Sequence, residues 1–132
     1  MPRRKRTQFW GAHIDDDRLV IEVMLGHKTA TVCKADEYFA ASGEFDDGDM
    51  QVGDLTDVYD LRERYRCTIQ VTEVYSLKFG AIPERLWRAE CCLSAEEFRA
   101  AHRKAWPQYL LDDDFELMAT HFRLADSNEE TA

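Results

Sequence analysis

The chain has 132 residues, 45% of them hydrophobic and 33% charged, which is the balance of one globular domain with a single core. Its formal net charge of −9 opposes tight binding to a long polyanion, and no apolar run approaches the roughly 20 residues that a membrane-spanning helix needs. The N-terminus lacks the apolar stretch of a secretory signal, so we expect a cytoplasmic protein without membrane contact.

Cysteine and histidine spacing gives no sign of a disulfide framework or a metal site. The four cysteines form no C-x-x-C pair, and Cys91 and Cys92 are adjacent, which is too close to bridge without strain. The four histidines are scattered singly. We therefore expect reduced thiols, no bound metal and no cofactor.

Basic residues are concentrated at the N-terminus, in Arg3 to Arg6. Because short charged termini are usually unstructured, residues 1–8 are predicted to form a flexible basic tail, with contact to RNA as the alternative. The remaining chain is predicted to hold one domain over 9–125 and a second flexible tail over 126–132.

The first half of the chain predicts one helix and two strands. Apolar residues recur at helical spacing over about 16–25, and Gly26 then supplies a stop. The β-branched run 29–33 predicts a strand directly after this helix. The acidic, glycine-containing segment 44–53 predicts a surface loop, and 55–59 predicts the next strand.

The second half predicts two further strands and two helices. Over 65–74, apolar and polar residues alternate, which predicts a strand with one core face and one polar face. Pro83 opens a short helix through Glu90, and a capping box at Ser94 opens a helix that ends before Pro107. With a last strand over 117–124, the pattern favours an α+β fold, a small β-barrel flanked by helices.

The segment 26–31, Gly-His-Lys-Thr-Ala-Thr, places a lysine beside two hydroxyls at a helix-to-strand junction. It belongs to an ordered set of motifs that resembles the ASCH family over about residues 9–124. The set consists of G-x-K-T-x-T at 26–31, V-G-D at 52–54, the strand 68–74, Arg-Ala-Glu at 88–90 and aromatic-R-x-x-H at 98–102.

The resemblance implies a barrel related to the PUA fold and a modified nucleoside or single-stranded RNA as ligand, with no protein partner expected. Some members resemble amidohydrolases that deacylate N(4)-acetylcytidine with a lysine, a threonine and a glutamate. By motif these fall on Lys28, Thr31 and Glu90. Other members resemble ribonucleases on single-stranded RNA, and others are RNA-binding modules. Some carry an arginine two residues beyond the second threonine, where this chain has Cys33.

The three residues have plausible chemistry of their own. A neutral lysine can take the proton of a threonine hydroxyl only if burial disfavours its charged form, and a glutamic acid can then protonate the leaving amine. Lys28 and Thr31 are three residues apart and face opposite sides of a straight strand, so Lys28 must precede the strand or a bulge must intervene. The competing interpretations are a solvated lysine, an ordinary strand threonine and a helix-end carboxylate.

Four further residues are candidates for substrate binding. They are Thr29, Tyr38, Trp10 and His102. An aromatic ring can stack on a nucleobase, but His102 falls on an apolar helical face, which is also typical of a hydrogen-bonded core histidine. The leading hypothesis from the sequence is hydrolysis of an N(4)-acylated cytidine. A single-stranded RNA ribonuclease and a non-catalytic RNA-binding module are the alternatives.

Overall fold

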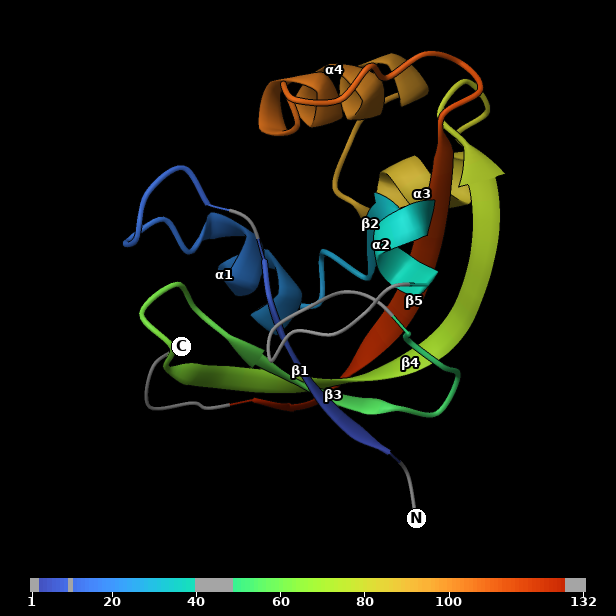
Figure 1. Cartoon of the computed structure of the whole chain (residues 1–132). Coiled ribbons are helices and arrows are strands. Elements are labelled where there is room, and N and C mark those ends of the chain that lie inside the picture. Colours follow the sequence, from blue (N-terminus) through green and yellow to red (C-terminus); the bar gives the residue numbers. More distant parts are fainter. Residues whose placement is uncertain (1–2, 10, 40–48, 128–132) are drawn as a thin grey trace.

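The computed structural model of the chain describes residues 3–9, 11–39 and 49–127, and within them it forms a curved sheet with helices around it (Figure 1). The strands are β1 (Arg4–Gln8), β2 (Ala30–Lys34), β3 (Leu55–Tyr59), β4 (Tyr65–Lys78) and β5 (Glu116–Ser127). The helices are α1 (Arg18–Met24), α2 (Ala35–Phe39), α3 (Glu84–Ala89) and α4 (Ala95–Ala105). The predicted α+β barrel-like fold is confirmed, and no described helix is long and apolar enough to cross a membrane.

The five strands lie in the order β1-β3-β4-β5-β2, and β1 pairs in parallel with β3 while the other neighbours are antiparallel. The long strand β4 bends strongly along its length (Figure 1). The β4–β5 register shifts at Thr68/Ile69 and again at Val71/Glu73, and such bulges increase the local twist of a sheet. The sheet therefore curves into an open half-barrel.

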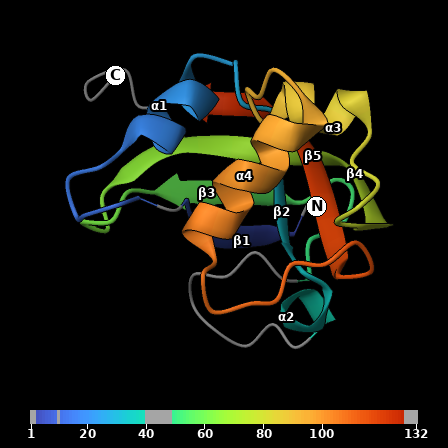
Figure 2. The same cartoon turned by 90° about the horizontal axis from the view of Figure 1, so that it is seen from above.

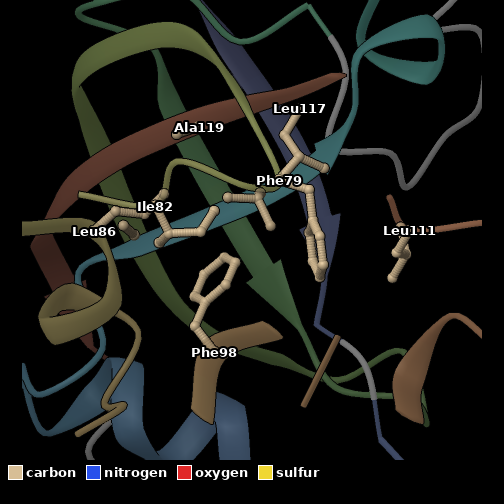
Figure 3. Close-up of a cluster of buried hydrophobic side chains, with 9 residues drawn as sticks. Phe79, Ile82, Leu86, Phe98, Leu111, Leu117 and Ala119 are labelled. Atoms are coloured by element: carbon tan, nitrogen blue, oxygen red, sulfur yellow. The ribbon is translucent and has the colours of Figure 1, made fainter. Parts of the chain in front are cut away.

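The two larger hydrophobic clusters of the core pack against different helices. One packs α3 and α4 against the sheet around Phe79, Leu86 and Phe98, each of them fully buried (Figure 3). The other packs α1 against the sheet through Val20 and Val23. Viewed from above, α4 crosses over the sheet, and α1 lies apart from α4, toward the upper left of the view (Figure 2). Helices α1 and α4 thus belong to different parts of the core.

The helices and strands predicted from periodicity all occur, with boundaries moved by a few residues. The predicted polar face of 65–74 is partly wrong, because Arg66 and Thr68 are buried like the apolar residues between them. The guanidinium of Arg66 lies inside because it forms ion pairs with Asp17 and Asp60. These ion pairs allow a charged side chain to be buried where the alternation of apolar and polar residues predicts an exposed one.

The prediction of a flexible tail at residues 1–8 is wrong for Arg4–Gln8, which form β1 at the edge of the sheet. Thr7 is 1% exposed, and Arg3 forms an ion pair with the buried Asp54. Acidic partners on and before β3 attract this basic segment and fix it as a strand. Strand β5 likewise runs to Ser127, into the predicted C-terminal tail.

Candidate functional site

Two of the predicted site residues lie at the ends of two different helices. After α1, Gly26 adopts φ +77°, Gly26 N–H donates to Val23 and His27 N–H donates to Glu22. These bonds form a Schellman motif, which ends the helix and sends the chain toward β2. Lys28 follows in this turn, before β2 begins at Ala30, so the geometric condition from the sequence is met.

The second residue, Glu90, is the C-cap of α3, which ends in a turn of the same kind. Cys91 adopts φ +64°, its N–H donates to Arg88, and the N–H of Cys92 donates to Trp87. This is again the bonding pattern of a Schellman motif, here with cysteine at the position where glycine is usual. The reversal leaves the Glu90 side chain at the tip of the helix.

A backbone hydrogen bond joins the two helix ends. The Thr29 N–H donates to the Ala89 carbonyl at 2.8 Å, and the Thr29 carbonyl accepts from Phe122 on β5 at 2.9 Å. These bonds hold the residues on either side, Lys28 and Glu90, next to each other. Thr29, predicted to bind substrate, does not line the cavity described below and instead supplies this link.

Lys28 and Glu90 form a buried ion pair. Lys28 Nζ donates to Glu90 Oε1 at 2.9 Å and to the carbonyl of Ala30 at 2.7 Å, and the two side chains are only 3% and 9% exposed. Lys28 Nζ also lies 5.4 Å from the centroid of the Phe9 ring, at cation–π distance. Buried charges of this kind require partners, and Lys28 has three.

The ion pair opens on a cavity of about 230 Å³ between α1, α4 and β2. Its polar lining comes from Lys28, Thr31, Glu90, Cys92 and His102. The other lining residues are apolar: Phe9, Leu19, Val32, Ala101, Ala105 and Trp106. The cavity thus combines apolar walls with a few polar groups at one place, which is the usual composition of a small-molecule site.

The structure brings four of the predicted site residues to this cavity and separates the others from it. Lys28, Thr31, Glu90 and His102 line it, and the Thr31 hydroxyl makes no hydrogen bond with any other described residue. Tyr38 lies on α2, where it packs near Met118 and donates to the Met50 carbonyl. Trp10 lies outside the described residues.

The sequence did not point to Cys92 as a cavity residue. Burial, followed by the nearby Glu90 carboxylate, raises the pKa of the Cys92 thiol to about 11, so the thiol is neutral at physiological pH. Phe9, Leu19 and Trp106 were also missed as lining residues. For Trp106 the sequence held one signal, since this residue shares a helical face with His102. Phe9 and Leu19 reach the cavity through tertiary packing, which the sequence alone does not reveal.

The sequence matches the model of the ASCH domain over residues 6–126. No curated protein matches the chain significantly.

Solved structures share the fold at low sequence identity. Protein EF3133 from Enterococcus faecalis V583 is 22% identical with a TM-score of 0.76, over 99% of this chain and 80% of that one. An ASCH domain from Lactobacillus crispatus JV V101 is 19% identical with a TM-score of 0.75, over 94% and 80%. ASCH from Zymomonas mobilis is 10% identical with a TM-score of 0.56, over 97% and 75%. These structures share the fold, and because the family model matches most of the chain, this protein belongs to the ASCH domain family.

Proposed function

We propose that this protein is an amidohydrolase that removes the acyl group from an N(4)-acylated cytidine. Thr31 is the nucleophile, Lys28 its base and Glu90 the proton donor to the leaving amine. The observation that carries the proposal is the buried Lys28–Glu90 pair, which opens on the same cavity as Thr31.

The Lys28–Glu90 pair can supply both proton transfers that amide hydrolysis requires, namely removal of a proton from the nucleophile and donation of a proton to the leaving amine. Transfer of a proton from Lys28 Nζ to Glu90 across the 2.9 Å contact leaves a neutral amine and a neutral acid. The amine then takes the Thr31 proton as Oγ1 bonds to the acyl carbon. When the C–N4 bond breaks, Glu90 gives its proton to N4 and cytidine leaves. Water then attacks the carbonyl carbon of the resulting threonine ester, which releases the carboxylic acid and restores the Thr31 hydroxyl.

Cavity size and charge support a nucleoside rather than a polymer as substrate. The volume of about 230 Å³ is below the roughly 300–1,000 Å³ of sites for drug-sized ligands. Lys28 is the only Lys or Arg among the described lining residues, and it is already paired with Glu90. Phosphate groups therefore find little to neutralise them here, which disfavours the ribonuclease alternative.

The test is turnover of N(4)-acetylcytidine by the purified protein and by four variants. Thr31→Val and Glu90→Gln should each lower kcat by about 100-fold or more, as expected for loss of a nucleophile or a proton donor. Lys28→Met should do the same. Thr29→Val is the matched control, because this neighbouring threonine does not line the cavity, and it should keep near wild-type turnover.

Other outcomes point to the other hypotheses. Turnover that survives Thr31→Val contradicts the threonine nucleophile. Cleavage of a labelled single-stranded RNA without release of cytidine favours a ribonuclease. Binding of nucleoside or RNA with no turnover of either leaves a binding module as the function.

A further inference from the structure

The two carboxylate oxygens of Glu90 have different surroundings. Oε1 accepts the hydrogen bond from Lys28, whereas Oε2 is buried and has no hydrogen-bond partner among the described residues. The Glu90 side chain is 9% exposed, so little solvent reaches it. An unsatisfied buried carboxylate oxygen is costly, and such an atom at a cavity wall indicates a ligand group that is absent from this structure.

His102 presents a second acceptor to the same space. Its Nδ1 lies 2.8 Å from the Phe98 carbonyl, which can only accept, so Nδ1 carries a hydrogen and donates. The imidazole also stacks on the Phe98 ring, with the centroids 4.1 Å apart, which fixes the plane of the ring. In the neutral imidazole Nε2 is therefore an acceptor, and it lies 3.8 Å from Glu90 Oε2.

Two acceptors cannot form a hydrogen bond with each other, but at this separation they can share one donor group. A nitrogen between them can make a hydrogen bond of about 2.9 Å to each. Among the described residues no donor bonds to Oε2, and the neighbouring Lys28 ammonium donates to Glu90 Oε1 and the Ala30 carbonyl instead. The missing partner of the pair is thus an N–H group on the ligand.

We propose that Glu90 Oε2 and His102 Nε2 form an acceptor pair that binds the N4 amino group of cytidine, which has two hydrogens once the acyl group has left, and selects cytidine-type over uridine-type bases. The inference rests on the proposed function for the identity of this nitrogen. Cytosine carries an amino donor at the position where uracil carries a carbonyl acceptor. A uracil carbonyl placed here faces a carboxylate and an imidazole lone pair, so it is rejected. His102 is a positioning residue in this scheme because it holds N4 beside Glu90.

The test measures the dissociation constants of cytidine and uridine by calorimetry for the wild type and four variants. The wild type should bind cytidine at least about tenfold more tightly than uridine, since each bond involves a strong acceptor and one of them is charged. In Glu90→Gln, Lys28 holds the amide oxygen, so the NH₂ group takes the position of Oε2. This variant should lose the preference for cytidine.

Two substitutions separate the role of Nε2 from the packing of the ring. In His102→Asn the amide nitrogen can keep the bond to the Phe98 carbonyl but the Nε2 acceptor is gone, so the preference should fall toward unity. In His102→Gln the amide oxygen can reach the position of Nε2 and should restore part of it. His27→Asn, at an exposed histidine paired with Glu22, is the matched control and should keep the full preference.

Equal binding of cytidine and uridine to the wild type overturns the inference, as does absence of binding by both. A cytidine preference that persists in His102→Asn or in Glu90→Gln, with melting temperatures showing folded variants, also overturns it. Turnover of N(4)-acetylcytidine is recorded in parallel. Cytidine selection without turnover removes the proposed hydrolase and keeps the acceptor pair, whereas turnover without selection does the reverse.

Discussion

At the scale of single residues, breaking the Lys28–Glu90 pair should cause a large loss in the free energy of unfolding. Both side chains are at least nine-tenths buried, so substituting one leaves an uncompensated charge inside the protein. Lys28→Met should lower the free energy of unfolding by about 3–5 kcal/mol. Replacing both partners, in Lys28→Met/Glu90→Met, should recover most of that loss because neither charge is then buried. Urea denaturation of both variants measures the difference.

An exposed ion pair provides the control for this prediction. Arg88 and Glu84 lie one helical turn apart on α3, and each side chain is 66% exposed. Glu84→Gln should therefore change the free energy of unfolding by less than about 0.5 kcal/mol. If the double variant is no more stable than Lys28→Met, the pair stabilises the fold by its own attraction and the argument from buried charge is wrong.

His121 makes the stability of the folded protein depend on pH. Burial, followed by the nearby Arg85 guanidinium, lowers the pKa of His121 below its usual value, and Glu73 and Glu90 oppose this shift. Tyr75 Oη lies 2.8 Å from its Nε2, and the two rings stack. The native state thus favours the neutral imidazole, and this contribution to stability is fully present above the unfolded pKa of about 6.5.

As the pH falls from about 6.5 through the lowered pKa of the folded state, the unfolded chain binds the proton first and stability is lost. Urea midpoints measured between pH 7.5 and 5 should therefore fall less for His121→Gln than for the wild type. His27→Gln, at the exposed histidine, should follow the wild type. A wild-type slope in His121→Gln assigns the dependence to other groups.

At the scale of elements, the two Schellman motifs that carry the site differ in one residue. The first has Gly26 in the left-handed conformation, whereas the second has Cys91 there with φ +64°. A side chain is strained in this region and glycine is not, so Cys91→Gly should raise the free energy of unfolding by about 0.5–1 kcal/mol. Thermal and urea unfolding measure the gain, and Cys91→Ala, which keeps the strain, should show none.

The elements found from the sequence are those with a strong local signal. Ser94 is the N-cap of helix α4, and its hydroxyl accepts from Glu97 N–H at 3.1 Å, which is one of the two bonds of the predicted capping box. Strand β1 has no such signal, because Thr7 is its only fully buried residue and its pairing with β3 lies some 50 residues away in sequence. Its charges look like those of a solvated tail until the acidic partners near β3 are known.

The candidate site was predictable only through its motif. Motif matching named Lys28, Thr31, Glu90 and His102, all of which line one cavity. Spacing alone could not have joined Lys28 to Glu90, which are 62 residues apart in sequence. The contact depends on two helix ends and one backbone hydrogen bond. Tyr38 and Thr29 were predicted from their residue types. In the fold Tyr38 packs away from the cavity, and Thr29 contributes only backbone hydrogen bonds.

At the scale of the whole molecule, the net charge of the protein affects binding of a long RNA far more than binding of a nucleoside in the cavity. The chain carries a formal charge of −9, and its N-terminal basic residues are partly engaged by acidic residues, as in the pairs of Arg3 with Asp54 and Arg4 with Asp57. These pairs reduce the charge that β1 can offer to a phosphate backbone. A nucleoside without phosphate is indifferent to the remaining field, whereas a long RNA is repelled by it.

Salt dependence therefore distinguishes the two kinds of ligand. Raising the salt from about 50 to 200 mM should change kcat/KM for N(4)-acetylcytidine by less than about twofold, because no counterions are released on binding. A protein that makes 6–10 phosphate contacts loses about 10³–10⁵ in affinity over the same range. Parallel titration with a single-stranded RNA that carries one N(4)-acetylcytidine completes the measurement. Tight binding of that RNA with a steep salt slope indicates a phosphate-binding surface outside the cavity, and the nucleoside is then only part of the natural substrate.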